Sequence, residues 1–353
     1  MKKEIVFLLK YNEISASTRQ RFLCYFPYID KKINIKTNIL FDKNYFVTKI
    51  LNNRFPLLKI LSSYFKRIIF ILSLAKNSKI IIQSELLPYA PIFLEKFLVY
   101  KKIKYIIDLD DAFFHRYDQS SNFLIKFFLK KKFNYIFQKA SCVILGSHYL
   151  RQQALLKGAK KTKIIPTGIV FSDYKKFFFS KKEKIFTIVW IGSPTTSHYL
   201  KKIFPVLEEF SKNYKFVLRL VGAHNIDTSY LPIETYKWSK DSEVSLLSES
   251  HLGIMPLENS YWEKGKCAFK LIQYMAAGLP VIGSPVGENR RVIKHGVNGF
   301  LANTNEQWFD YLELMYKNKK LRNKFGNNGK NFIKNNYSIE YLQKEFQKTL
   351  NIL

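Results

Sequence analysis

The sequence predicts an α/β protein with two domains, each built on a parallel sheet. Short apolar runs of strand length alternate with longer helical patterns, an order typical of doubly wound parallel sheets. The pattern lapses once, where Pro166-Thr167-Gly168 is turn chemistry and Lys175–Lys184 is a charged, irregular run. A chain of 353 residues is also too long for one ordinary core and long enough for two.

Each side of this break carries its own series of expected strands. A helix is expected from Thr18, and the tail from Ser338 has the pattern of one amphipathic helix. We therefore expect a first domain over residues 1–172, a second over 183–336, and a tail, 338–353, that packs back on the first. The expected strands are Ile5–Leu9, Lys79–Ile82, Tyr105–Ile107 and Cys142–Leu145, then Phe186–Ile191, Phe216–Val221, Leu252–Met255, Pro280–Gly283 and Gly299–Leu301.

The composition is that of a globular protein, with 47% apolar and 24% charged residues. Cys24, Cys142 and Cys267 are widely scattered, which gives neither a disulfide framework nor a metal-binding spacing. The early apolar run Ile5–Leu9 is too short for a signal peptide, and no apolar run approaches the length of a membrane span. A cytoplasmic location is the expectation.

The net charge of +31 is concentrated in the first half of the chain. Residues 1–172 hold 31 Lys and Arg against 10 Asp and Glu, whereas the remaining residues hold 27 against 17. Two basic amphipathic stretches, Leu57–Ala75 and Asn122–Gln138, lie in this half, and such surfaces attract anionic lipid. The alternative is a general lysine bias, with solvated lysines on helices that cover the sheet. Nucleic acid is disfavoured because no zinc-finger, RNP-type or helix-turn-helix signature is present.

One candidate phosphate site follows the strand Thr187–Ile191. That strand runs into Gly192-Ser193-Pro194-Thr195-Thr196-Ser197 and then a helical stretch. Small residues let a ligand approach the backbone, and free N–H groups at a helix start suit a phosphate. Ser and Thr are also ordinary N-caps, so a simple capped helix is the alternative.

A second candidate is the segment Pro256–Gly287, which enters a helix that Gly278-Leu279-Pro280 ends. Lys266 and Lys270 would lie at the N-terminal end of this helix, where positive charge is unfavourable unless an anion also binds. Four residues apart on a starting helix, they would share one face, with Gln273 on the same side. We expect a diphosphate at the lysines and a ribose at Gln273, whose amide donates and accepts. Solvated lysines are the alternative.

Together these segments resemble the family 4 retaining glycosyltransferases, which have the GT-B fold: two facing Rossmann-like domains with a cleft between them. The resemblance covers nearly the whole chain, and the order and spacing of the segments carry it. They are the signature-like Pro256–Gly287, Ser17–Arg21 with Tyr25–Tyr28, Asp108–Ala112, Ile165–Gly168, Trp190–Pro194 and the tail from Tyr337-Ser338.

The resemblance implies an activity. It implies transfer of a sugar, with retention, from a nucleotide-diphosphate donor to a glycan acceptor, expected to be lipid-linked, in bacterial cell-surface polysaccharide synthesis. It implies a metal-independent enzyme, and we expect no cofactor. The basic first half of the chain predicts a peripheral position on the inner face of the membrane. Because the leaving diphosphate gains negative charge, catalysis would consist mostly of charge stabilisation in a dry site.

The same reasoning assigns candidate residues to three groups. The segment Asp108–Ala112, the acidic turn, could instead be a capped loop with solvated carboxylates, or a cation site with His115. The catalytic candidates are Lys270, Lys266, Asp110 and Asp111; the donor-binding candidates are Gly192, Ser193, Trp238, Ser239, Glu263, Phe269 and Gln273; and the acceptor-side candidates are Ser17, Thr18, Arg19, Glu85, Asp108 and His115.

The chain departs from the family's pattern at two positions. The usual signature has two glutamates eight positions apart, and Gly265 and Gln273 stand there instead. Gly265 cannot offer a carboxylate to the donor sugar, although Glu263, Glu258 or the backbone amides of 266–269 could replace it. Two other functions stay open. One is a nucleotide-sugar epimerase, because the GT-B fold also hosts that reaction. The other is a non-catalytic, membrane-associated sugar- or lipid-binding protein, which the absence of Glu at 265 and 273 favours.

Overall fold

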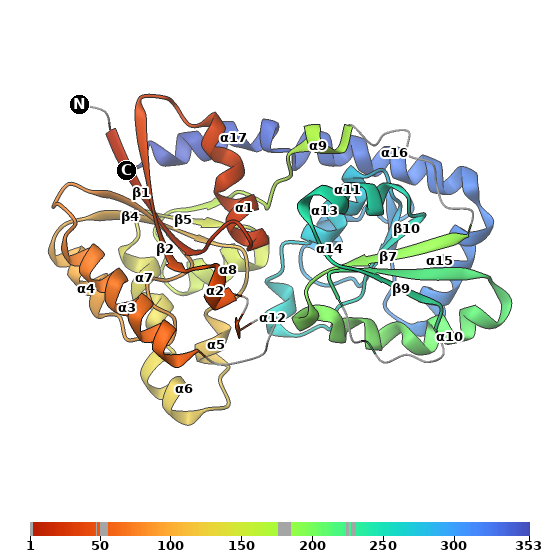
Figure 1. Cartoon of the computed structure of the whole chain (residues 1–353), viewed down its shortest axis with the longest axis horizontal. Helices are drawn as coiled ribbons and strands as arrows, with labels where there is room; N and C mark the ends of the chain where they lie inside the picture. Colours follow the sequence, from red (N-terminus) through yellow and green to blue (C-terminus); the bar gives the residue numbers. More distant parts are fainter. Residues whose placement is uncertain (1–2, 47, 50–55, 176–184, 224–225, 227–230) are drawn as a thin grey trace. The chain divides into compact units, whose positions relative to one another are not determined.

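The computed structural model describes residues 3–46, 48–49, 56–175, 185–223, 226 and 231–353 (Figure 1). Its contacts divide the chain into two compact units. Unit 1 comprises residues 1–167, 265–267 and 342–353, and unit 2 comprises 168–264 and 268–341. Along the chain the division falls at 167/168, so residues 168–172, expected in the first domain, group with the second unit.

The sheet of unit 1 has six parallel strands in the order β2-β1-β3-β4-β5-β6. Its centre is almost entirely apolar: every residue of the run Ile5–Leu9 is at most 1% exposed, because both faces of a parallel sheet are covered. The strands are β1 (Lys3–Tyr11), β2 (Ile33–Phe41), β3 (Lys79–Gln83), β4 (Lys104–Leu109), β5 (Cys142–Leu145) and β6 (Thr162–Ile164).

Helices connect these strands, and most of the C-terminal helix α17 (Ile339–Leu350) also belongs to unit 1. In α17, Phe346 stacks on Tyr25 at 4.4 Å between ring centroids, and Glu345 pairs with Lys163 at 2.8 Å. The other helices of unit 1 are α1 (Ala16–Arg21), the 3₁₀ turn η1 (Leu23–Tyr28), α2 (Lys43–Phe46), α3 (Leu57–Leu72), α4 (Phe93–Tyr100), α5 (His115–Asp118), α6 (Phe123–Leu129), α7 (Lys132–Lys139) and α8 (His148–Leu156).

Unit 2 has a second six-stranded parallel sheet, in the order β12-β11-β10-β7-β8-β9. Read along the chain, this is the strand order of dinucleotide-binding Rossmann folds. The strands are β7 (Phe186–Ile191), β8 (Phe216–Val221), β9 (Ile233–Tyr236), β10 (Leu252–Met255), β11 (Val281–Gly283) and β12 (Gly299–Leu301).

Each face of this sheet has its own apolar core. Val189 and Ile191 contribute to one core, whereas the alternating residues Ile188 and Trp190 contribute to the other. The covering helices are α9 (Phe171–Lys175), the 3₁₀ helix η3 (Pro194–Ile203), α10 (Phe204–Asn213), α11 (Lys240–Ser248), α12 (Tyr261–Lys264), α13 (Phe269–Ala276), α14 (Asn289–Val292), α15 (Asn305–Lys317) and α16 (Lys319–Asn336).

The prediction of a two-domain α/β fold is confirmed, and the strands that it missed lie at sheet edges. β2, β6 and β9 each border a sheet on one side only. In β2 only two of the nine residues are buried, so no continuous apolar run marks the strand. The stretch Asn122–Gln138 is not one helix, because α6 ends at Leu129 and α7 begins at Lys132. No helix among the described residues is long and apolar enough to cross a bilayer.

Candidate functional site

The donor-site candidates gather at the carboxyl edge of the sheet of unit 2. β7 lies between β8 and β10 in the sheet. The chain adds β8 and β9 on one side of β7 and then adds β10, β11 and β12 on the other side. Open α/β sheets bind ligands outside the carboxyl ends of strands at such a switch point. Gly192 directly follows β7, Pro256 follows β10, and α13 begins a short distance further along the chain.

Lys270 occupies the first turn of α13, next to this edge. Its ammonium lies 3.8 Å from the centre of the Trp190 ring and 3.5 Å from the Thr196 hydroxyl oxygen. The helix has no acidic residue in its first turn and no side-chain cap, and its N-cap, Ala268, has a left-handed φ of 54°. An uncapped helix N-terminus with a lysine at its second position is suited to an anion, because the helix dipole and the ammonium both favour negative charge.

Gly192 makes room for this lysine. A Cβ atom at Gly192 would lie 2.6 Å from the Lys270 ammonium and 2.5 Å from the Trp190 ring, so a larger residue would displace them. The Gly192 amide, however, donates to the Val221 carbonyl at 2.9 Å. The expectation that this N–H group holds the diphosphate is therefore wrong, because the sheet already uses it. The Ser193 hydroxyl bonds the Thr195 hydroxyl at 2.8 Å.

A carboxylate that the sequence analysis missed, Glu243 of α11, connects three donor-side side chains. Its Oε1 accepts a hydrogen bond from the Gln273 amide at 2.7 Å and from the Tyr174 hydroxyl at 3.2 Å. Its Oε2 accepts one from the Trp238 indole N–H at 2.6 Å. Gln273 is 4% exposed, and burial followed by the nearby Glu243 charge raises the pKa of Tyr174 well above its usual value.

Glu243 owes its position to a helix cap. Ser239, a donor-site candidate, is the N-cap of α11, and its hydroxyl accepts a hydrogen bond from the Ser242 amide at 3.1 Å. Its local role is therefore to start the helix that carries Glu243. Nothing in the local sequence distinguished Glu243 from a solvated helix glutamate, since two of its three partners, Tyr174 and Gln273, come from distant segments.

Two further donor-side expectations are wrong. Lys266 and Lys270 do not share a helix face, because α13 begins only at Phe269; Lys266 groups with unit 1, where its ammonium is 3.9 Å from Asp111. Glu263, expected near the donor sugar, is 6% exposed, and its two oxygens accept hydrogen bonds from Tyr199 and Ser260. Phe269 is half-buried at the start of α13.

The acceptor-side candidates of unit 1 lie mostly inside it. Asp108 is 2% exposed, and both of its oxygens bind Arg21, at 2.9 and 2.5 Å. Burial raises the pKa of Asp108 to about 6, and the Arg21 charge opposes this rise. Arg21 also donates to the Ile165 carbonyl. Asp108 thus forms a buried ion pair that holds α1 to the sheet, which is a structural position and not a surface for an acceptor.

Glu85 and His115 are also engaged in internal contacts. Glu85 is 2% exposed and accepts from Lys132 at 2.7 Å and from the Tyr117 hydroxyl at 2.6 Å. The ring nitrogens of His115 contact Asp118 at 2.7 Å and the Tyr149 hydroxyl at 2.8 Å. These contacts rigidify the loops after β3 and β4.

The segment between β1 and α1 is fixed by its own polar side chains. Gln83, at the end of β3, donates to the Ser17 hydroxyl at 3.0 Å and accepts from the Thr18 hydroxyl at 3.2 Å. Arg19 donates to the carbonyls of Glu13 and Ile14, both at 2.8 Å. These three candidates therefore shape the carboxyl edge of unit 1.

Asp110 and Asp111 remain the partly exposed members of the acidic turn. The backbone carbonyl of Asp110 accepts a hydrogen bond from the Cys267 thiol at 2.9 Å. Within the described residues, no group of three His, Cys, Asp or Glu side chains is arranged to hold a metal ion.

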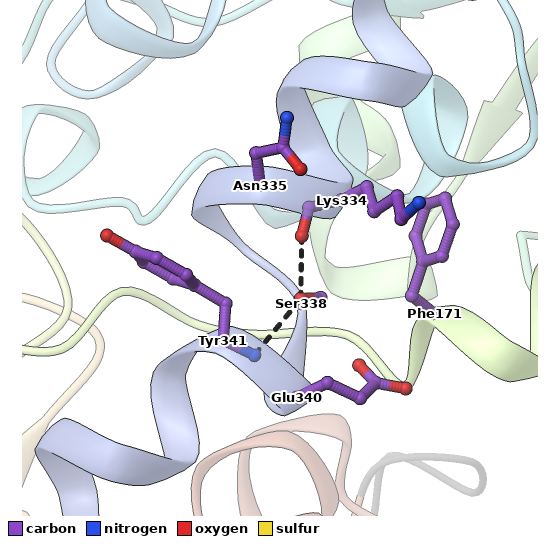
Figure 2. A pocket seen from close by; sticks show the side chains of 6 residues that line it. All are labelled: Phe171, Lys334, Asn335, Ser338, Glu340 and Tyr341. Carbon is purple, nitrogen blue, oxygen red and sulfur yellow. Dashed lines mark hydrogen bonds between the residues drawn. The ribbon is translucent and has the colours of Figure 1, made fainter.

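A hollow of about 570 Å³ lies elsewhere in unit 2, at the junction of α16 and α17 (Figure 2). There Ser338 donates to the Lys334 carbonyl and accepts from the Tyr341 amide, at 2.7 and 3.2 Å, which turns the chain between the two helices. None of the donor-site candidates lines it; its lining residues are Phe171, Lys334, Asn335, Ser338, Glu340 and Tyr341.

Known proteins are similar to this chain both in unit 2 and across its fold. Residues 173–332, most of unit 2, match the family model described as "Glycosyl transferases group 1". Among solved structures, the fold is similar to Anabaena HepE in complex with UDP-glucose, with a TM-score of 0.70, 15% identity and coverage of 99% of this chain and 100% of that one. It is also similar to sucrose-phosphate synthase from Thermosynechococcus elongatus, with a TM-score of 0.67, 11% identity and coverage of 99% and 98%. The chain has the GT-B fold, with two Rossmann-like α/β units.

Two curated proteins match shorter parts of the chain. A GDP-Man:Man(3)GlcNAc(2)-PP-Dol alpha-1,2-mannosyltransferase of Dictyostelium discoideum is 29% identical over 110 residues, which is 30% of this chain and 21% of that protein. An uncharacterised glycosyltransferase of Methanocaldococcus jannaschii is 25% identical over 150 residues, which is 42% of this chain and 36% of that protein. The matches thus span well under half of these relatives. The family model and the Methanocaldococcus jannaschii relative are described as glycosyltransferases, and the Dictyostelium relative is described as a mannosyltransferase.

Proposed function

We propose that this protein transfers a sugar from a nucleoside diphosphate donor, bound by unit 2, to a glycan acceptor, bound by unit 1. The observation that carries the proposal is the pairing, on α13, of an ammonium at an uncapped helix N-terminus with Gln273 one turn later. Lys270 would hold the diphosphate, and the group of Gln273, Glu243 and Trp238 would hold the nucleoside. The ammonium contact strengthens as the leaving diphosphate gains charge, so it favours the transition state over bound donor.

Product formation from a panel of UDP- and GDP-sugars, followed by mass spectrometry, tests the proposal. The acceptor source is a lipid extract. Transfer should fall strongly in Lys270→Met and should persist in Lys294→Met, a control in unit 2 whose ammonium also lies over an aromatic ring, 5.8 Å from the centre of Phe332. Equal activity of the two variants would remove Lys270 from the site.

The two alternative functions give different results in the same assay. An epimerase would convert the sugar without lasting release of nucleoside diphosphate and without need of an acceptor. A non-catalytic binding protein would bind UDP or GDP but would not turn over any of the UDP- or GDP-sugars. Release of nucleoside diphosphate that depends on the lipid extract supports the transferase and excludes both.

We further propose transfer with retention and without a metal ion, as the resemblance to family 4 implies, in the synthesis of bacterial cell-surface polysaccharide. The anomeric configuration of the first product, read from the proton–proton coupling of its anomeric signal, decides the stereochemistry. A product of inverted configuration would overturn the proposal of retention while leaving the transferase activity standing.

We propose that unit 1 places the enzyme on anionic membrane lipid, where it would reach a lipid-linked acceptor. Helix α6 exposes Phe123, Leu124, Phe127 and Phe128, each by at least 63%, and has a lysine, Lys126, but no acidic residue. Helix α3 similarly exposes large apolar side chains next to lysines, without an acidic residue; the exposed ones are Leu57, Leu58, Leu61, Phe65, Ile69 and Leu72. Apolar insertion and lysine attraction are the two signals of stable interfacial binding.

Vesicle co-sedimentation tests this location. Binding to vesicles with phosphatidylserine should exceed binding to neutral vesicles, should weaken with salt, and should fall in Phe127→Ser/Phe128→Ser. If light scattering instead shows a wild-type dimer that the same double variant dissociates, a second copy of the chain covers α6. That result, or equal binding to both vesicle types, would contradict membrane docking.

A further inference from the structure

Unit 1 has a switch point of its own. The strand order places β1 between β2 and β3, so the carboxyl ends of β1 and β3 lie side by side where the direction of chain progression reverses. Such an edge is the usual ligand position in an open α/β sheet. β1 ends with Lys10-Tyr11, and β3 is followed by Ser84.

Lys10 is an unusual side chain for this position. It is only 6% exposed, yet its ammonium has neither a hydrogen-bond acceptor nor an ion-pair partner in the part of the chain that the structure describes. It faces the ring of Phe113, 4.9 Å from the centroid. The Arg116 guanidinium lies over the same ring at 4.8 Å, so one aromatic side chain holds two cations. A buried lysine without a counter-ion is costly, and an arriving anion would offset that cost.

The charges around Lys10 make the position positive. Burial lowers the pKa of Lys10 to about 8; Glu85 and Asp110 oppose this lowering, whereas Arg116 and Lys49 add to it. Burial also lowers the pKa of Lys49, and Arg116 again adds to the effect. Glu85 is already committed to Lys132 at 2.7 Å. Two cations, Arg116 and Lys49, thus lie close enough to Lys10 to lower its pKa further.

The segment after β3 carries a second, independent sign of a ligand site. Ser84 has a left-handed φ of 59°, which is strained for a serine. Its hydroxyl is buried without a hydrogen-bond partner and could donate to a phosphate oxygen. Strained backbone and unsatisfied buried polar groups concentrate where a bound molecule completes the structure. Tyr89, 53% exposed and also at positive φ (58°), offers a ring on which a sugar could stack.

We propose that Lys10 and Arg116, at the carboxyl ends of β1 and β3, bind a phosphate group of the acceptor. The identification of the bound molecule as the sugar acceptor rests on the proposed function. The existence of an anion site does not depend on the reaction. The acceptor would therefore be a phosphorylated sugar compound, whether a lipid diphosphate or a free sugar phosphate.

The test uses inorganic pyrophosphate as the probe and calorimetric titration as the measurement. All titrations are made in Lys270→Ala, so that the donor-site lysine does not contribute. In this background, pyrophosphate should bind, and Lys10→Met or Arg116→Gln should weaken it by about tenfold or more, because hydrogen bonds to a charged ligand are lost. Lys36→Met is the control: its exposed ammonium also lies over a ring, 5.4 Å from Phe70, but in the middle of β2.

Thermal unfolding separates a binding lysine from a structural one. Because Lys10 is buried without a counter-ion among the described residues, Lys10→Met should raise Tm while pyrophosphate binding is lost. A lower Tm with unchanged pyrophosphate affinity would mean that Lys10 only supports the fold, and the proposal would fall. Equal affinity in Lys10→Met and Lys36→Met would overturn it as well.

Two further ligands distinguish the sources of the phosphate. Geranyl diphosphate stands for a lipid diphosphate and glucose 1-phosphate for a free sugar phosphate. The ligand whose affinity falls more in Lys10→Met identifies the acceptor class. If Lys10→Met lowers the affinity for neither ligand, the proposal is overturned. Binding of UDP or GDP to the wild-type protein is measured in parallel. If nucleotide binding fails while the pyrophosphate results hold, the proposed function is wrong and the anion site stands.

Discussion

The Gln273 side-chain amide donates a 2.7 Å hydrogen bond to Glu243 of α11. A helix elsewhere in unit 2 thus brings a carboxylate next to residue 273, where the signature that the sequence resembles has its second glutamate. The chain thus keeps one negative charge there, carried by Glu243 rather than by residue 273. A second carboxylate at 273 would lie directly against the first, and like charges at this distance repel.

A second substitution at Glu243 should therefore compensate for the damage that Gln273→Glu causes on its own. Gln273→Glu alone should lower Tm and raise the KM for the nucleotide-sugar donor at pH 8, because two buried carboxylates face each other. The double variant Glu243→Gln/Gln273→Glu should recover much of the lost Tm and of the donor KM, because the pair again consists of one carboxylate and one amide. Steady-state kinetics and thermal unfolding of the three variants measure the coupling; strictly additive effects would show that the pair does not act as a unit.

Lys270 should contribute to turnover as well as to binding. Loss of a hydrogen bond to a charged group costs about 1.5–3 kcal/mol, so Lys270→Met should lower kcat/KM for the donor roughly ten- to hundredfold. The drop should appear in kcat, because the ammonium contact strengthens as the diphosphate leaves. A variant with unchanged kcat and a higher KM would show uniform binding of donor and transition state instead.

Asp108 should prove structural, whereas Asp110 should not. Asp108→Asn leaves the buried Arg21 guanidinium without its charge partner, and breaking one side of such a pair typically costs about 3–5 kcal/mol. Asp110→Asn, in the partly exposed turn, should leave the denaturation midpoint close to that of wild type. Guanidinium unfolding of the two variants makes the comparison, and similar midpoints would refute the assignment.

Glu95 should make the protein less stable at neutral pH than at mildly acidic pH. Burial raises its pKa to about 6 from an ordinary value near 4.5, with Lys132 opposing, and its Oε1 atom has no partner among the described residues. The charged form is thus the costly one: the destabilisation is absent below about pH 4.5, develops as the pH rises to about 6, and is complete above it. Glu95→Gln should accordingly stabilise the protein by about 2 kcal/mol at pH 7 and by little at pH 4.5.

The matched control for this prediction is Glu208→Gln, on the exposed side of α10. Its difference from wild type should stay small and flat across the same range, as for other surface substitutions. Urea unfolding at several pH values provides the curves. A Glu95→Gln gain that does not change with pH would show that the burial of charge is not its cause.

Metal removal should leave the transfer activity unchanged. The proposed chemistry uses the Lys270 ammonium and the N-terminus of α13 to hold the diphosphate. Dialysis against EDTA followed by assay in metal-free buffer, with and without added Mg²⁺ or Mn²⁺, checks this. Activity that is lost on dialysis and returns with the metal ion would contradict the prediction.

The sequence by itself determined the two α/β units and the strands buried inside them. A buried parallel strand is an unbroken apolar run, as in Phe186–Ile191, and such a run is legible without any knowledge of its neighbours. Edge strands such as Ile33–Phe41 carry polar residues on their exposed side and lack that signal. The turn glycines and the helix that carries Lys270 and Gln273 were likewise local features.

Only the tertiary structure decided what the polar side chains contact. Asp108 and Glu263 had the residue types of a site, but folding gave each of them internal partners, Arg21 for one and Tyr199 with Ser260 for the other. Glu243 and Lys10 looked ordinary in the sequence and became significant because distant segments meet them. A charge is a site or a structural pair according to the groups that surround it in space, and for Asp108 the partner Arg21 lies 87 residues away along the chain.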